Sequence, residues 1–396
     1  MVRQPLSMVF LFVATLSGMS LWFMAAAIIP DMAAEAGLTS ADLAWLSSVV
    51  PAGFGFGALG FALFGLPDRT DPRVLFAGCA LAIALLNLLL LIVEIGGPLA
   101  IAIRFASGVL MAGTWPVSMK IAVGWTVRRR GALMGSLVAA LVAGQAVPYL
   151  LAWFGGTNWR LAISLGSAIT ASGGLLILLS SLGPHHARSA AFRSRSILAA
   201  WTDPRIRAAI LGYLGHMWEF IAFWAWVGAF ASVSYSATLG AEAAANLGKI
   251  SAFLCILAAA PACLLSALVA DRIGKDRVAA VALATSGSAC VLTALTFGGP
   301  PWITFVLLLI WGAAVVPDSP QFSALVADFS PAELTGTLLT LQASLGFLMT
   351  AVTTQATPWI ADTCGWPITI GLLALGPVFG LFFMRPVRSK STDAGA

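Results

Sequence analysis

Charged residues are scarce in this sequence: Asp, Glu, Lys and Arg make up only 9% of its 396 residues. A soluble globular chain carries about 25% charged residues, so this composition excludes that class. The net charge of +5 does not indicate nucleic-acid binding, because the basic residues are dispersed among short loops. The hydrophobic content of 60% predicts instead a protein that crosses a lipid bilayer many times.

Patterns typical of enzymes, nucleotide sites and metal sites are also missing. The glycine-rich run at 53–57 lacks a following Lys-Ser/Thr pair, so close helix packing explains it better than phosphate binding. No nucleophile and base form a catalytic pattern, and we expect no enzyme activity, no cofactor and no ATP-driven transport. An odd number of cysteines without metal-ligand spacing indicates small buried hydrophobic residues rather than a metal site: Cys79, Cys255, Cys263, Cys290 and Cys364.

Long hydrophobic runs recur along the whole chain. Each has roughly 20 residues, enough to span about 30 Å of hydrocarbon. The first run follows a single basic residue, Arg3, without a cleavage site, and predicts an uncleaved helix rather than a signal peptide. The fold class is therefore an all-α membrane protein with twelve transmembrane helices. The predicted spans are residues 6–30, 43–65, 74–94, 99–124, 132–152, 160–182, 209–230, 245–269, 278–297, 302–324, 335–356 and 366–384.

Lys and Arg predict the orientation of these spans. With a cytoplasmic N-terminus, 17 of the 21 basic residues fall on the cytoplasmic side. The exceptions are Arg104, Lys120, Arg160 and Lys249. We therefore predict a multi-pass protein of a bacterial inner membrane, surrounded by the lipid bilayer, with both termini in the cytoplasm.

The chain divides into two halves that repeat each other. The polar stretch at 183–204 predicts a cytoplasmic linker, and its adjacent His185 and His186 are interpreted as solvated residues rather than metal ligands. The predicted domains are a six-helix bundle at 1–182, a linker at 183–208 and a six-helix bundle with a short tail at 209–396. Internal repeats of this kind are typical of secondary transporters. The repeated features are the loops at 67–73 and 270–277 and the spacings Gly108 to Pro116 and Gly312 to Pro320.

Several short segments resemble motifs of the major facilitator superfamily. The run DRIGKDR at 271–277 resembles the family's signature loop, G-x-x-x-D-R-x-G-R-[KR]. Its copy in the first half has Phe64 and Pro72 where the signature has glycine. The run RFASGVLMA at 104–112 is similar to the family's arginine motif in the fourth helix. The run GTNWR at 156–160 resembles the Trp-Arg sequence that begins the sixth helix.

This resemblance covers essentially the whole chain and implies the fold of the family. The fold has two pseudo-symmetric six-helix bundles that rock to give alternating access, and it implies a monomer. The family's cavity is lined mainly by the first, fourth, seventh and tenth helices. Independently of the family, the ionisable residues well inside predicted spans fall on the fourth, seventh and tenth spans. Four loop residues are expected to act as gating latches rather than substrate ligands: Asp68, Arg69, Asp271 and Arg272.

The stretch 211–230 is apolar enough to cross a bilayer, yet it contains His216 and Glu219. Because a carboxylate is costly in hydrocarbon, Glu219 is predicted to couple protons, giving up its proton when the cavity faces the cytoplasm. The alternative is a structural ion pair with Arg104 or Lys120. His216 lies about 60° from Glu219 on the helix and either assists the proton and the substrate or satisfies a neighbouring group. We expect this face, which includes Trp226, to form one wall of a water-accessible cavity.

Three other charged residues are candidates for substrate binding. Arg104 either grips an anion through two parallel hydrogen bonds or supports proton coupling and helix packing. Lys120 either contacts the substrate or extends toward the cytoplasm. Asp318, which lies between two prolines, either binds a substrate or cation or caps a broken helix.

Tryptophans are the remaining candidates for the cavity wall. Trp22, Trp115 and Trp226 are predicted to line it, because they lie on inner helices or share the face of Glu219. The alternative for each is packing or anchoring at the membrane interface.

These patterns predict a secondary active transporter that moves a small-molecule substrate across the membrane, coupled to the movement of protons. The basic pair Arg104 and Lys120 favours an organic or inorganic anion as the substrate. The alternative is a proton-driven efflux pump for hydrophobic or cationic compounds, which the aromatic walls and the acids Glu219 and Asp318 would suit. Two halves with buried titratable groups favour a carrier over a channel.

Overall fold

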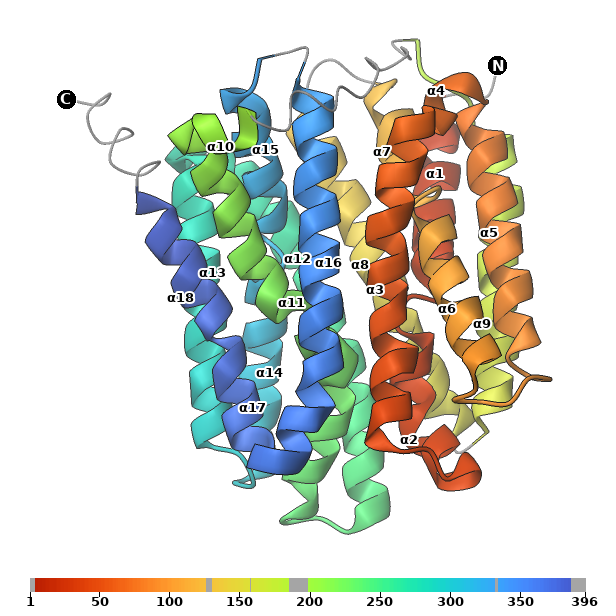
Figure 1. The fold of residues 1–396 in the computed structure, drawn as a ribbon, viewed down its shortest axis with the longest axis vertical. Helices are drawn as coiled ribbons and strands as arrows, with labels where there is room; N and C mark the ends of the chain where they lie inside the picture. Colours follow the sequence, from red (N-terminus) through yellow and green to blue (C-terminus); the bar gives the residue numbers. More distant parts are fainter. Residues whose placement is uncertain (1–3, 126–129, 157, 185–198, 332–333, 386–396) are drawn as a thin grey trace.

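The computed structural model describes residues 4–125, 130–156, 158–184, 199–331 and 334–385. These residues form helices that pack as two bundles side by side (Figure 1). Most of the predicted linker, at 185–198, lies outside the described residues, as do Arg3 and the C-terminal tail. The first bundle comprises α1 (Gln4–Met19), α2 (Met24–Ala36), α3 (Ser40–Phe64), α4 (Leu66–Arg69), α5 (Pro72–Leu89), α6 (Pro98–Met111), α7 (Trp115–Val123), α8 (Arg130–Gly155), α9 (Trp159–Leu176) and a 3₁₀ turn, η1 (Ile177–Leu179).

The second bundle follows the short helix α10 (Ala199–Thr202). Its helices are α11 (Pro204–Ser236), α12 (Ala241–Ile273), α13 (Lys275–Leu295), α14 (Pro301–Val315), α15 (Ser319–Phe329), α16 (Thr335–Cys364), α17 (Trp366–Leu373) and α18 (Leu375–Phe383). Asp203 caps the N-terminus of α11 by accepting a hydrogen bond from the backbone N–H of Arg205, so this helix begins before the predicted span at 209–230.

Eleven helices in the described residues, some formed by two consecutive segments, are long and apolar enough to cross a membrane. The first predicted span is divided between α1 and α2, with an interruption at residues 20–23. Counting α1 and α2 as one crossing gives twelve, and the twelve-helix fold is confirmed. The start of α1 and the end of α18 lie at the same end of the molecule (Figure 1). Following the predicted orientation, we name this the cytoplasmic end.

The fourth and tenth crossings are interrupted at equivalent places. One breaks between α6 and α7, the other between α14 and α15, and each second segment carries a proline in its first turn. Proline has no backbone N–H to continue the preceding helix, so Pro116 and Pro320 fit the start of a new one. Thr114 and Asp318 occupy the residue before each new helix.

Two glycines in these crossings make matching contacts. A Cβ on Gly108 would collide with the Val50 carbonyl of α3, and a Cβ on Gly312 would collide with the Cys255 carbonyl of α12. Each glycine therefore lets the fourth or tenth crossing approach the second crossing of its own bundle. The repeat read from the sequence thus corresponds to a repeated packing contact.

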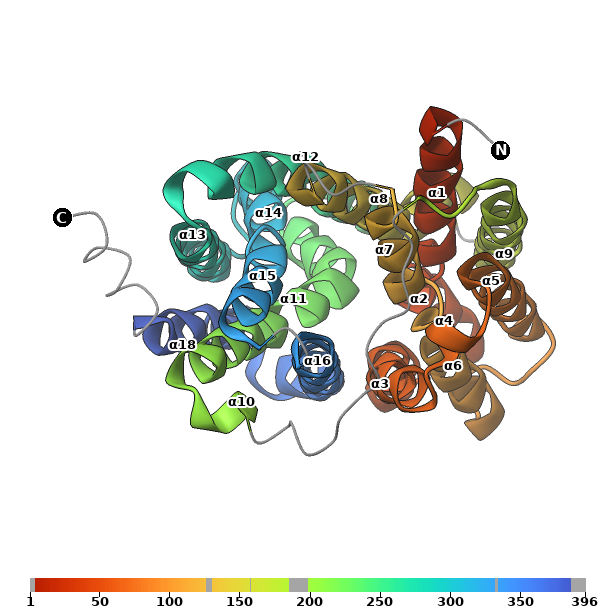
Figure 2. The same ribbon diagram turned by 90° about the horizontal axis from the view of Figure 1, so that it is seen from above.

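The two bundles meet along two pairs of helices, α3 with α16 and α8 with α12 (Figure 2). Aromatic rings fill part of this interface. Trp22 packs on Phe54 of α3 and on Phe347 of α16, with ring centroids 5.3 Å and 5.5 Å apart. The interruption between α1 and α2 therefore lies against both bundles.

Candidate substrate and proton site

Glu219 lies inside the second bundle and is fully buried. Its Oε1 accepts a hydrogen bond from Trp311 Nε1 of α14 at 2.6 Å, and its Oε2 accepts one from Ser286 Oγ of α13 at 3.0 Å. One turn along α11, the Phe223 ring stacks on the Trp311 ring, with ring centroids 3.7 Å apart and an angle of 9° between the ring planes. The carboxyl group therefore has two neutral donors and is held by helices of its own bundle.

His216 and Asp318 form a second buried acid–base pair, with exposed fractions of 0% and 1%. Nδ1 of His216 lies 2.9 Å from Oδ1 of Asp318. The two atoms are close but poorly aligned, so both ring nitrogens and Oδ1 lack a hydrogen bond of good geometry within the described structure. The Asp318 side chain does not cap α15. A proton can be shared across this contact, and the pair has capacity for further hydrogen bonds.

The structure differs from the predicted water-accessible wall on α11. His216 and Glu219 are both completely buried, because α13, α14 and the α14–α15 break cover their face. Trp226, expected beside them, is also buried, and its Nε1 donates to the Thr354 carbonyl of α16 at 3.1 Å. Spacing along α11 identified a shared face but not the helices that cover it.

Arg104 is buried at 2% exposure and points into the first bundle. Its guanidinium donates to three backbone carbonyls, those of Leu46, Leu21 and Trp22, at 3.4, 3.5 and 3.3 Å. Leu21 and Trp22 lie in the interruption between α1 and α2, where the regular helical ladder is broken. Arg104 therefore ties three crossings together, and Glu219 has partners other than this arginine.

Lys120 lies toward the cytoplasmic end of α7. Its Nζ lies 2.5 Å from Oδ1 of Asp68 and 2.5 Å from the Pro67 carbonyl, both on α4. The lysine thus extends toward the loop that resembles the family's signature. It contacts a predicted gating residue rather than Glu219.

The other predicted residues fall into two groups. Trp22 is 3% exposed and packs at the interface between the bundles, whereas Trp115 is half-buried at the start of α7. The gating candidates lie at the cytoplasmic ends of helices. Arg69 is exposed on α4, and Asp271 and Arg272 are exposed at the end of α12.

Lys249 is a polar link between the bundles that the sequence interpretation missed. This α12 residue is 8% exposed, and its Nζ lies 2.8 Å from Oδ2 of Asp31 on α2. Nζ also donates to the Gly156 carbonyl at 2.8 Å and the Ala152 carbonyl at 3.4 Å. The signal was available, since Lys249 is one of four basic residues that break the charge rule and lies in an apolar span.

Other polar contacts gather at the same, extracytoplasmic end. Ser48 of α3 donates to Gln355 of α16 at 2.5 Å. Within the first bundle, Arg160 pairs with Glu35 at 2.6 Å. The Arg160 guanidinium and the Trp159 N–H hold the pKa of the exposed Glu35 carboxyl below its usual range.

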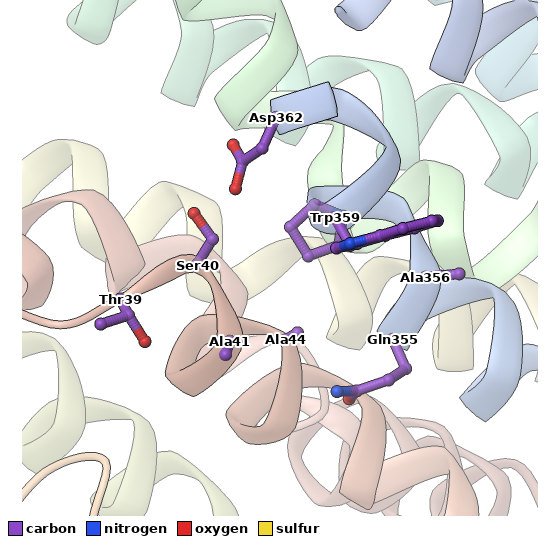
Figure 3. A pocket seen from close by; sticks show the side chains of 9 residues that line it. Thr39, Ser40, Ala41, Ala44, Gln355, Ala356, Trp359 and Asp362 are labelled. Atoms are coloured by element: carbon purple, nitrogen blue, oxygen red, sulfur yellow. The ribbon is translucent and has the colours of Figure 1, made fainter. Parts of the chain in front are cut away.

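A groove of about 630 Å³ opens between the bundles near this end (Figure 3). It lies between the start of α3 and the end of α16, with Ser40 and Trp359 on opposite sides. Gln355, which bonds to Ser48, also lines it. The groove therefore lies over the polar contact that joins α3 to α16.

Buried polar atoms without hydrogen-bond partners form the second feature that the sequence interpretation missed. In the described residues they include Gln145 Oε1 on α8, Trp224 Nε1 on α11 and both amide atoms of Gln342 on α16. Most buried polar groups in proteins are paired, so these atoms indicate where a bound molecule or a second conformation supplies a partner. Across the described ranges, no three His, Cys, Asp or Glu side chains are grouped as a metal site.

Twelve crossings, two repeated bundles and acids buried in the membrane define a membrane transporter rather than an enzyme. A model described as Major Facilitator Superfamily matches residues 10–354. The chain therefore belongs to the major facilitator superfamily. A search of curated protein sequences gives no match.

Two solved structures share this fold. A crystal structure of a point mutant of the nucleoside transporter NupG has a TM-score of 0.72 at 14% identity, covering 96% of this chain and 99% of that one. The xylose transporter XylE from E. coli, in a partially occluded inward open conformation, has a TM-score of 0.72 at 13% identity, covering 96% and 97%. At these identities the likeness establishes the fold alone.

Proposed function

We propose that this chain is a proton-coupled secondary transporter that moves a small solute across a bacterial inner membrane by alternating access. The observation that carries the proposal is Glu219, a carboxyl group at 0% exposure whose bonded partners are a tryptophan and a serine. A carboxylate without a counter-ion is costly in hydrocarbon, so such groups usually have a function in ion or proton movement.

The proton is taken up and released by the acid–base groups of the second bundle. Glu219 is the principal carrier. His216 lies one turn from it along α11 and faces Asp318 at the start of α15. Because neither carboxyl is bonded to a Lys or Arg among the described residues, each can hold a proton without first breaking such an ion pair. Rocking of the two bundles then changes the water access of these groups.

The substrate class follows from which groups remain available. The predicted preference for an anion depended on Arg104 and Lys120, and each already has partners in the first bundle. A small polar solute is therefore the better-supported substrate. Efflux of hydrophobic or cationic compounds is the second candidate, favoured by the aromatic interface around Trp22 and by the buried acid Asp318.

The proposal also covers the orientation in the membrane, the oligomeric state and the gating residues. The termini face the cytoplasm, the protein works as a monomer, and Asp68, Arg69, Asp271 and Arg272 control closure of the cytoplasmic end. The contact of Asp68 with Lys120 supports this role, because it joins α4 to α7 at that end.

Proton-linked current in proteoliposomes tests the proposal. The solutes are uridine, D-xylose, benzoate, phosphate and tetraphenylphosphonium. Uridine and D-xylose are included because the two proteins of similar structure are a nucleoside transporter and a xylose transporter. Wild type is compared with Glu219→Gln and with Glu94→Gln, which changes an exposed carboxyl. We expect Glu219→Gln to exchange solute across the membrane but to lose proton-driven accumulation, and Glu94→Gln to match wild type.

Two results would contradict the proposal. If Glu219→Gln accumulates solute with an unchanged pH dependence, Glu219 is not the proton carrier. If only tetraphenylphosphonium gives a response, the efflux function is correct and the polar-solute class is wrong.

A further inference from the structure

Two of the unpaired buried atoms lie where the bundles meet. Gln145, on α8 of the first bundle, is 3% exposed and presents an acceptor without a donor. Trp224, on α11 of the second bundle, is 0% exposed and presents an N–H without an acceptor. Leaving such groups unpaired is unfavourable, so their presence requires another explanation, which a bound ligand would supply.

Tyr149 of α8 joins the helices that carry these two residues. Its hydroxyl donates to the Trp224 carbonyl at 2.5 Å and lies 3.2 Å from the Ala225 carbonyl. Gln145 precedes Tyr149 by four residues, which places it on the same face of α8 about 6 Å along the axis. Gln145 is therefore one helical turn along α8 from a residue that contacts the backbone of Trp224 in the other bundle.

Aromatic rings surround this position. His216, Phe220 and Trp224 follow one another at intervals of four residues along α11, with ring centroids 5.0 Å and 4.6 Å apart. Phe23 of the first bundle packs against Trp224 at 6.1 Å and against Tyr149 at 6.5 Å. The surface that both bundles present here is built largely from flat rings.

The charge at this position is balanced. Glu219 is the titratable group nearest to Trp224 along α11, but its carboxyl is bonded to α13 and α14. His216 lies two turns from Trp224 in the same row of rings, and it faces Asp318. The imidazole and the carboxyl face each other, so a charge on either one has a partner in the other. A charged solute would find no free counter-charge here, and burying it would be costly.

From these contacts we propose that Gln145 and Trp224 recognise an uncharged, flat heterocyclic solute. The solute accepts a hydrogen bond from Trp224 Nε1, donates one to Gln145 Oε1 and stacks on the aromatic rings. The inference rests on the proposed transport function and adds the class of cargo. A polyol would satisfy the two hydrogen bonds but would leave the ring faces unused.

Thermal unfolding of the purified full-length protein at fixed pH tests this assignment without requiring proton coupling. The probes are uracil and nicotinamide as flat uncharged rings, xylitol as a polyol, benzoate as an anion and tetraphenylphosphonium as a cation. We expect a saturable rise in Tm with at least one flat ring. Trp224→Phe and Gln145→Leu each weaken its apparent affinity by about fivefold to tenfold, the effect of losing one hydrogen bond.

The ligand-free Tm of each variant separates recognition from folding. Gln145→Leu removes an unpaired atom at nearly constant volume, so its ligand-free Tm stays at or above that of wild type. Trp224→Phe places a smaller ring in a fully buried position and should lower the ligand-free Tm, so its loss of affinity is judged against the control below. The matched control is Trp218→Phe, which loses a hydrogen bond to the Leu372 carbonyl. This control should lower the ligand-free Tm and leave the affinity for the flat ring unchanged.

The assignment is overturned if no flat ring binds, if only xylitol or a charged probe binds, or if both variants bind the ring with wild-type affinity. A failure of the proposed function looks different. In that case the ring binds and the two variants weaken it, but Glu219→Gln in proteoliposomes retains proton-driven accumulation.

Discussion

The fourth and tenth crossings have the same backbone design but opposite charges. Gly108 and Gly312 make matching contacts, and Pro116 and Pro320 follow matching breaks, so residues 204 positions apart correspond. In this register Arg104 corresponds to Leu308, and Asp318 corresponds to Thr114. The first bundle has a buried cation where the second has leucine, and the second has a buried acid where the first has threonine.

The helices around each crossing explain the difference. Arg104 is satisfied because the interruption between α1 and α2 turns the Leu21 and Trp22 carbonyls toward it. The corresponding seventh crossing, α11, is continuous from Pro204 to Ser236. Without an interruption, its carbonyls point along the helix axis, so a guanidinium near Leu308, unlike Arg104, would find no acceptors freed by a break.

The comparison teaches that one repeated frame can carry two kinds of buried charge. In the first bundle the charge is enclosed by backbone carbonyls and holds three crossings together. In the second, Glu219 is bonded to neutral donors and Asp318 faces a misaligned histidine. On the proposed function, the first bundle supplies a rigid support and the second supplies the proton chemistry.

The largest effects are expected when the residues at 104 and 308 are exchanged, which tests whether only the first bundle can accommodate a buried cation at this position. Leu308→Arg buries an unpaired charge, at a cost of about 3–5 kcal/mol, and we expect no monodisperse protein after purification. Arg104→Leu leaves carbonyls without donors, each costing about 1–3 kcal/mol, and should fold with a clearly lower Tm. Size-exclusion chromatography and thermal unfolding measure both. A well-folded Leu308→Arg would show that α11 can supply acceptors after all.

The second exchange concerns Asp318. Asp318→Thr introduces the residue of the first bundle, where Thr114 Oγ1 donates to the Met111 carbonyl at 2.8 Å. Because threonine can make the same local bond, we expect stability to change by no more than about 1 kcal/mol. Proton-driven uptake should fall to the level of empty liposomes, as measured by tracer accumulation. Retained accumulation would mean that the acid in the tenth crossing has only a structural role.

The smallest expected effect concerns Lys249, which joins the bundles. Lys249→Met removes its pairing with Asp31, and the conformational equilibrium should shift toward opening at the extracytoplasmic end by roughly 1 kcal/mol, or about fivefold. Labelling of a cysteine introduced near this contact, with a membrane-impermeant reagent, measures the shift. The control exchanges the pair as Lys249→Asp with Asp31→Lys and should restore much of the wild-type labelling. Equal labelling in all three proteins would show that this ion pair does not hold the end closed.

The sequence was sufficient to predict the crossings, the repeat and the family. A run such as 278–297 has to cross a bilayer because no other environment hides its apolar length, and the glycine and proline spacings follow from local backbone requirements. The partners of buried side chains were less accessible. Arg104 and Lys120 were possible anion ligands until their distances to carbonyls and to Asp68 were known.

Sequence alone determined that Glu219 and Asp318 lie in the membrane, since hydropathy and the cost of burying charge are properties of local composition. Only the tertiary structure decided that Glu219 is bonded to Trp311 and Ser286, that Asp318 faces His216, and that Lys249 reaches Asp31 across 218 residues. The physical reason is that a side chain's partners depend on how separate helices are rotated and packed. Periodicity within one helix defines a face but does not identify the helix that covers it.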